Sequence, residues 1–173
     1  MKEQGLYYLT SDFATMVKTI GGTWEDTKHR PVVCLVKSSE NDHIYWAIPM
    51  GNLKHRTQEQ VDRINTFLNY PERDIRSCYY HIGRTTAKSI FFISDAIPVT
   101  DDYIESEHLD FQGNHFIIKN PQLISELNRK LSRILAMENS RPNLYRQHIT
   151  DIKKHLIEEQ EEKNKEETDK SGK

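Results

Sequence analysis

The sequence predicts an α+β protein: a small, strongly bent, largely antiparallel sheet or partly open barrel, with helices packed on it. Three observations support this prediction. Short runs of Val, Ile, Tyr and Trp are separated by turn residues, as in the strands of an antiparallel sheet. Longer segments elsewhere carry apolar residues at helical spacing. The length of 173 residues suits one domain, which we expect to span residues 1–157.

The N-terminal part predicts a strand, a helix and a hairpin. Residues 5–10 read as the first strand, and residues 11–22 as a short helix that ends at two consecutive glycines. Two apolar runs, Pro31 to Val36 and Ile44 to Ile48, then flank the polar turn SSEND. This pattern predicts a β-hairpin whose second strand ends near Pro49.

The rest of the domain is predicted to contain one helix, four strands and then two further helices. Residues 56–69 are predicted to form an amphipathic helix, whose apolar face contains Val61, Ile64, Phe67 and Leu68. Asn120-Pro121 predicts a helix start, with Asn as cap and Pro at the first helical position, and a final helix is expected to begin near Pro142. Further strands are expected at 77–82, 88–94, 96–99 and 114–119.

The C-terminal segment, residues 158–173, contains no apolar side chain. Such a segment buries too little surface to offset the entropy of ordering it, so we expect a disordered tail or a frayed helical extension. The composition of the whole chain, with 36% hydrophobic and 29% charged residues, suits a soluble protein. No apolar run approaches the ~20 residues that span a bilayer, and the N-terminus lacks a signal peptide. We therefore expect a cytoplasmic protein with no membrane partner.

Several kinds of site are disfavoured by the absence of their motifs. The sequence contains no GxGxxG, GxxxxGK[ST], GxSxG or HExxH motif, which argues against a nucleotide loop, a serine hydrolase and a zinc protease. The eight histidines are scattered, and no carboxylate cluster has metal-ligand spacing. Cys34 and Cys78 both lie in predicted strands and read as small buried side chains. We expect no cofactor and no metal, which disfavours a metal-dependent nuclease.

The most informative stretch runs from Arg30 to His55. Arg30 enters the first hairpin strand at the end where the second strand leaves, and Gly51, Asn52, Lys54 and His55 follow that second strand at once. Two permanent cations and an imidazole are thereby expected within reach of one another. This arrangement suits binding a phosphodiester, although turn and surface roles explain the same residues equally well.

RNA cleavage without a metal needs only such groups. The ribose 2′-hydroxyl attacks its own phosphate, so a base, an acid and cations for the charged transition state suffice. The candidate catalytic residues are Arg30 as a phosphate clamp, Lys54 as a transition-state cation, His55 as acid or base, and Asn52 as an amide donor. Candidate RNA-binding residues are Gly51, Arg56, Arg84, Thr85 and Thr86.

The order of several short motifs resembles a known family. RPVVCLV, YWAIP, LKH, FFISDAIPVTDDYI, HFIIKNPQLISELNRKLSRIL and ITDIKKHL follow one another as in the endoribonuclease toxins of type III toxin–antitoxin systems. These form the ToxN, AbiQ and CptN group, and the CptN branch is the most similar. The resemblance covers roughly residues 5–157. On these motifs, Arg30 matches the family's cation at the hairpin, and Lys54 matches its loop cation.

This resemblance implies a MazF/PemK-like fold and sequence-preferring, metal-independent cleavage of RNA to a 2′,3′-cyclic phosphate. It also implies two kinds of partner. One is a small repeated antitoxin RNA, which the toxin processes and binds in a closed, ring-like assembly. The other is cellular or phage RNA as substrate.

The chain departs from the family at one position. Family members often have Thr-Ser or Ser-Ser where this chain has Gly51-Asn52. Either His55 or a hydroxyl from elsewhere replaces those groups, or this chain cleaves poorly. Two alternatives therefore stay open: a MazF/PemK-type toxin with a protein antitoxin, and a non-catalytic RNA-binding module on the same fold.

Overall fold

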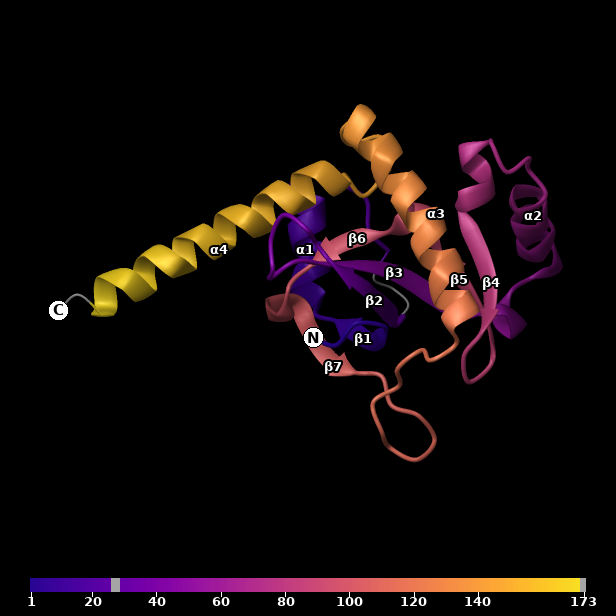
Figure 1. Ribbon diagram of the computed structural model, residues 1–173, viewed down its shortest axis with the longest axis horizontal. Coiled ribbons are helices and arrows are strands. Elements are labelled where there is room, and N and C mark those ends of the chain that lie inside the picture. Colours follow the sequence, from indigo (N-terminus) through magenta and orange to yellow (C-terminus); the bar gives the residue numbers. More distant parts are fainter. Residues whose placement is uncertain (26–28, 172–173) are drawn as a thin grey trace.

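The computed structural model describes residues 1–25 and 29–171, which form an α+β fold around one antiparallel sheet (Figure 1). The strand order is β4-β5-β3-β2-β1-β7, with β6 paired to β3, and the sheet does not close into a barrel. The strands are β1 (Gly5–Leu9), β2 (Val32–Lys37), β3 (Tyr45–Asn52), β4 (Tyr80–Arg84), β5 (Lys88–Phe92), β6 (Ile97–Val99) and β7 (Ile104–Glu107). The helices are α1 (Ser11–Thr19), α2 (Gln58–Leu68), α3 (Pro121–Ser140) and α4 (Ile149–Ser171).

The predicted hairpin is confirmed as β2 and β3. Val32 lies opposite Pro49, and the Met50 N–H donates to the Pro31 carbonyl at 3.0 Å. The other edge of β3 is shared by two strands: residues 45–47 pair with β6, and residues 50–52 pair with β5. The last residues of β3 therefore lie between the start of β2 and the strand β5.

The central strands are buried on both faces because their side chains alternate between two cores. Leu6, Val33 and Ile48 pack with the apolar stripe of α3. Their neighbours Tyr7, Val32 and Ala47 pack on the other side with α1 and the first turns of α4. The two cores explain why the β2 and β3 runs are continuously apolar.

Two helix starts agree with their sequence signals. The Asn120 side chain accepts hydrogen bonds from the backbone N–H groups of Gln122 and Leu123, as the predicted Asn-Pro cap requires. Thr57 and Gln60 form a reciprocal capping box at the start of α2. This box fixes where the chain turns from the hairpin into α2.

The predicted strand 77–82 is wrong in its first half. Residues Ile75–Cys78 form a 3₁₀ turn, and β4 begins only at Tyr80. Asp74 accepts the Arg76 N–H through its carboxylate, a local hydrogen bond that favours a turn over a strand. Cys78 is buried as expected, but it lies in this turn.

The predicted strand 114–119 is not formed, and β7 was not predicted. Residues 114–119 make only isolated bridges, including Ile117 with Gly5. β7 takes the edge of β1 instead, with Tyr8 opposite Ser106. The sequence IESE of β7 has one apolar residue, so its strand character depends on this pairing.

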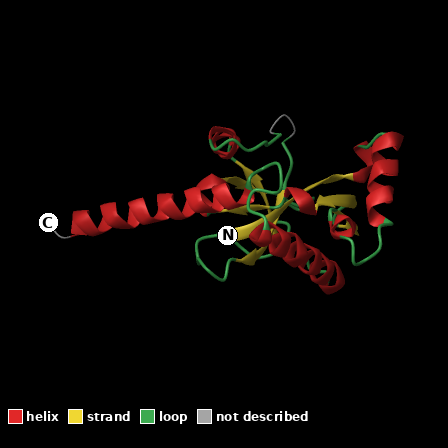
Figure 2. Cartoon of the chain, turned by 90° about the horizontal axis from the view of Figure 1, so that it is seen from above, coloured by secondary structure: helices red, strands yellow, loops and turns green. Residues whose placement is uncertain are grey.

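The C-terminal helix begins later than predicted. It starts at Ile149 instead of near Pro142, because Asn143 and His148 have positive φ angles of 58° and 61° that interrupt a helix. It continues to Ser171 and projects from the body (Figure 2), so residues 158–171 form a helical extension, one of the two alternatives expected for the tail. Residues 172–173 of that predicted tail lie outside the described part. Of the helices in the described part, none has the length and apolar character needed to cross a membrane.

Candidate functional site

Two arginines meet at one aromatic ring near the end of the β2–β3 hairpin. The Arg30 Cζ lies 5.4 Å from the Phe92 ring centroid, and the Arg56 Cζ lies 5.0 Å from the same centroid. Both distances are within the range of cation–π attraction. Phe92 ends β5, which pairs with β3, so the sheet brings residues 30, 56 and 92 together.

Gly51 makes room for this arrangement. A Cβ atom at Gly51 would lie 2.7 Å from Nη2 of Arg56 and 3.6 Å from the Phe92 ring. The Arg56 side chain therefore passes directly over the Gly51 backbone toward Phe92. Gly51 was predicted as an RNA-binding residue; in the structure the group that lies against its backbone is the Arg56 side chain.

Both arginines line a cavity of about 470 Å³, a size common for ligand sites. We call it the arginine cavity. Its walls come from α2, the start of β4, the end of β5 and the connection between α3 and α4. Among its described lining residues are four arginines and two carboxylates, a net charge of +2, together with five aromatic residues: Arg30, Arg56, Arg63, Arg146, Glu25, Asp95, Phe67, Tyr79, Tyr80, Phe92 and Tyr145.

The carboxylates neutralise two of the arginines. Glu25 accepts from Arg30 at 3.1 Å and lies 3.6 Å from Arg146, which also forms a bidentate pair with Asp95 at 3.2 and 2.9 Å. The Asp95 hydrogen bonds raise the pKa of Arg146. These pairs hold Arg30 and Arg146 in place at the cavity wall.

Arg56 is different, because no hydrogen bond or ion pair joins its guanidinium to a residue within 1–25 or 29–171. Its Nε is buried without an acceptor in that part of the chain. Burial, and then the neighbouring charge of Arg30, lowers the pKa of Arg56. Two like charges held against one ring repel each other, and an anion between them relieves that repulsion. Arg63 likewise has no partner among residues 1–25 and 29–171, but its side chain is exposed, whereas Arg56 is partly buried beside Arg30. Arg56 is thus the cation best placed to accept an external anion.

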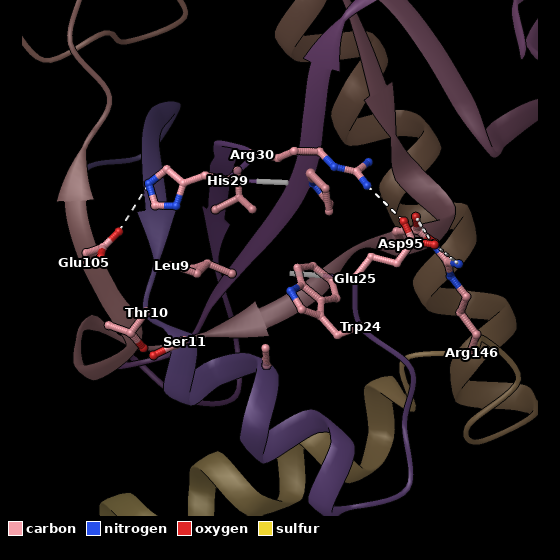
Figure 3. A pocket seen from close by; sticks show the side chains of 13 residues that line it. Leu9, Thr10, Ser11, Trp24, Glu25, His29, Arg30, Asp95, Glu105 and Arg146 are labelled. Carbon is pink, nitrogen blue, oxygen red and sulfur yellow. Dashed lines mark hydrogen bonds and ion pairs between the residues drawn. The ribbon is translucent and has the colours of Figure 1, made fainter. Parts of the chain in front are cut away.

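A second cavity of about 240 Å³ adjoins the first (Figure 3). The two share Glu25, Arg30, Asp95 and Arg146 in their linings. Figure 3 shows His29 on its other side, where Nε2 lies 3.3 Å from the Glu105 carboxylate. The His29 ring also stacks on Tyr8 at 4.3 Å. Arg30 thus stands between a cationic, aromatic cavity and a smaller one with a histidine at its rim.

The other predicted catalytic residues lie in the 3₁₀ turn Leu53–His55 that follows β3. Asn52 caps this turn: its Oδ1 accepts the Lys54 N–H at 2.9 Å, which leaves the amide NH₂ for a ligand. Lys54 and His55 are exposed and line neither of the two cavities. The hairpin thus places Lys54 at the same end of the sheet as Arg30, outside the cavity that Arg30 lines.

The predicted RNA-binding turn at residues 84–86 lies beside that 3₁₀ turn. Asn52 pairs with Ser89, and the Thr85 hydroxyl is 2.9 Å from the Ser89 hydroxyl. Arg84 and Thr86 are exposed on the same β4–β5 turn. Ser89 and Phe92 are three residues apart on β5, or ~10 Å at ~3.3 Å per strand residue. The predicted residues therefore form two groups. One contains residues 52–55 and 84–86, near Ser89 of β5, and the other contains Arg30 and Arg56, at Phe92 of the same strand.

Sequence reasoning missed the rest of the cavity. Arg146 comes from the α3–α4 connection and Asp95 from the turn after β5, and no local motif links them to Arg30. Phe92 was read only as part of an apolar run. Arg63 carried a weak signal, because residues 51–90 contain seven Lys and Arg residues against four Asp and Glu residues.

A search of the described residues for three or more His, Cys, Asp or Glu side chains able to hold a metal ion finds no such group. No protein-family model matches the chain, and no curated protein matches it.

Proposed function

We propose that this chain is a metal-independent endoribonuclease, the toxin of a type III toxin–antitoxin system. It acts in the cytoplasm on cellular or phage RNA, and a small repeated antitoxin RNA holds it inactive. The order of the motifs from RPVVCLV to ITDIKKHL supports the family. In this proposal the open antiparallel sheet is an elaborated MazF/PemK-like fold, and the antitoxin RNA binds the toxin in a closed assembly.

The main structural support for RNA binding is the pair of guanidinium groups, from Arg30 and Arg56, that lie against the Phe92 ring. Arg30 and Arg56 present planar donors that match a phosphate, and Arg56 has no carboxylate partner among the described residues. The neighbouring aromatic rings suit unpaired bases, which stack on such side chains in RNA-binding proteins. A phosphodiester with a splayed base fits this combination of groups.

The proposed reaction needs a base, an acid and cations that stabilise the charged transition state. A base removes the proton of the 2′-hydroxyl, whose oxygen forms a bond to phosphorus while the bond to the 5′-oxygen breaks. An acid protonates the leaving 5′-oxygen, which gives a 2′,3′-cyclic phosphate and a 5′-hydroxyl end. Arg30 and Arg56 hold one phosphate of the strand, and the adjacent phosphate lies at the 3₁₀ turn. There Lys54 stabilises the developing charge, Asn52 donates through its amide, His55 takes the proton of the 2′-hydroxyl, and water protonates the leaving 5′-oxygen.

One observation favours the non-catalytic alternative, an RNA-binding module. Two hydroxyls near the loop are already engaged, because Thr57 caps α2 and Thr85 bonds to Ser89. Neither is a ready substitute for the Thr-Ser pair that family members often have. His55 is then the group on which catalysis depends.

Incubating the purified protein with a long RNA in EDTA separates these functions. We expect cleavage at a restricted set of sites, with 2′,3′-cyclic phosphate and 5′-hydroxyl termini identified by enzymatic end-labelling. Arg56→Gln should reduce cleavage, while Lys165→Gln, which removes a positive charge on the projecting part of α4, should not. Retention of RNA without cleavage supports the binding module, and no RNA retention at all contradicts both.

A further inference from the structure

The arginine cavity contains more than a phosphate site requires. Aromatic contacts run through its wall from Phe92 to Tyr80 at 6.0 Å, from Tyr80 to Phe67 at 5.4 Å, and from Phe67 to Tyr79 at 5.5 Å between ring centroids. All four rings are partly exposed and line the same cavity as Arg30 and Arg56. The two guanidiniums lie at the Phe92 end of this series.

These rings come from three separate elements. Phe67 comes from α2, Tyr79 directly precedes β4, Tyr80 begins β4, and Phe92 ends β5. A capping box fixes the start of α2, β4 pairs with β5, and β5 pairs in turn with β3. The wall is therefore formed before a ligand arrives, which lowers the entropy lost on binding.

We infer that the arginine cavity binds one unpaired nucleotide, with its phosphate at Arg30 and Arg56 and its base against Phe67, Tyr79 and Tyr80. This inference rests on the proposed function for its RNA substrate and goes beyond it in assigning a base pocket. The base held there sets the sequence preference of cleavage, because it fixes which nucleotide lies next to the phosphate that reaches the 3₁₀ turn Leu53–His55. Lys54 and His55, outside the cavity, do not contact this base.

The cavity volume and charge are consistent with one nucleotide. About 470 Å³ lies within the 300–1,000 Å³ typical of small-molecule sites. The net charge of +2 on its described lining matches a phosphate dianion or the backbone of a strand that passes through. Glu25 already forms an ion pair with Arg30, so an incoming phosphate must compete with this carboxylate for Arg30. At Arg56 no such ion pair within the described residues competes with the phosphate.

Binding of free nucleotides tests the pocket without depending on cleavage. Calorimetric titration with the four nucleoside 5′-monophosphates should show at least one that binds more tightly than inorganic phosphate. Phe67→Leu should weaken the binding of that nucleotide roughly 5- to 100-fold, the range of base–aromatic stacking. The affinity for inorganic phosphate should not change. Arg56→Gln should lower the affinity for both the nucleotide and inorganic phosphate about 10-fold or more, because a charge-assisted hydrogen bond is lost. Phe111→Leu, at a ring that is 95% exposed outside the cavity, is the matched control.

A second arm uses RNA and the positions of the cuts. Phe67→Leu should change which nucleotide adjoins the cut, whereas Lys54→Ala should slow cleavage at unchanged positions. Tyr80→Leu repeats the test if Phe67→Leu lowers the melting temperature. The base pocket would be overturned if nucleotides bind no better than inorganic phosphate. Equal nucleotide binding by the wild type, Phe67→Leu and Tyr80→Leu would overturn it as well. Nucleotide binding without RNA cleavage would leave the pocket standing and reject the endoribonuclease.

Discussion

Replacing Lys54 by alanine is expected to lower the rate of RNA cleavage by about 10²–10³-fold, the usual effect of removing one group that stabilises transition-state charge. The fold should survive, because Lys54 is exposed and its structural contact, the hydrogen bond to Asn52, uses the backbone N–H. Single-turnover cleavage of a long RNA in EDTA measures the rate, and growth inhibition in cells that express the variant should be lost with it.

Lys165→Ala is the control for the loss of one exposed lysine. It should cleave RNA and inhibit growth like the wild type, since Lys165 lies on the projecting part of α4. RNA affinity should fall much less than the rate in Lys54→Ala, because the two arginines on Phe92 remain. Full cleavage by Lys54→Ala would remove the 3₁₀ turn Leu53–His55 from the mechanism.

The largest loss of stability outside the apolar core is expected for Glu138→Ala. The Glu138 side chain is 2% exposed and lies near the end of α3. It accepts hydrogen bonds from the backbone N–H groups of Asn143, Leu144 and Thr150 and from the Thr150 hydroxyl, at 2.6 to 3.2 Å. It thereby satisfies donors of the α3–α4 connection and of the first turn of α4.

Alanine at position 138 leaves these donors without an acceptor, which should lower the free energy of unfolding by about 2–4 kcal/mol. Urea denaturation measures this as a lower midpoint at an unchanged slope. Glu161→Ala, at an exposed position of α4, should shift the free energy by less than ~0.5 kcal/mol. Equal midpoints for the two variants would show that the Glu138 hydrogen bonds do not stabilise the connection. Because Tyr145 and Arg146 lie in this connection, Glu138→Ala should also weaken ligand binding in the arginine cavity.

The sequence predicted well the parts of the fold whose signals are local. The β2–β3 hairpin, the Asn120 cap and the amphipathic α2 each follow from residues within a few positions of one another. One failure is local, because the Asp74–Arg76 hydrogen bond makes a 3₁₀ turn where a strand was predicted. Two others involve a distant partner or a single backbone angle. β7 depends on pairing with β1, about 100 residues earlier, and the start of α4 depends on the positive φ angle of His148.

The candidate site shows the same division. The sequence placed Arg30, Gly51 and Lys54 at one end of the hairpin, and the register of β2 and β3 agrees. It did not show that Arg56 points back over Gly51 to Phe92, because that contact requires β5 to pair with the end of β3. It also did not bring Glu25, Asp95 and Arg146 to the same cavity, since their ion pairs join three segments distant along the chain.

The salt dependence of RNA binding tests the central claim most directly, namely that Arg56 neutralises a phosphate. A 2′-O-methyl RNA is suitable, because it lacks the attacking hydroxyl and cannot be cleaved. For a single strand, the slope of log K against log salt changes by about 0.7 for each phosphate that the protein neutralises. We predict that Arg56→Gln makes this slope shallower by about 0.7 and weakens binding, while Lys165→Gln changes neither. An unchanged slope and affinity in Arg56→Gln would contradict the assignment of the arginine cavity as the site that binds RNA.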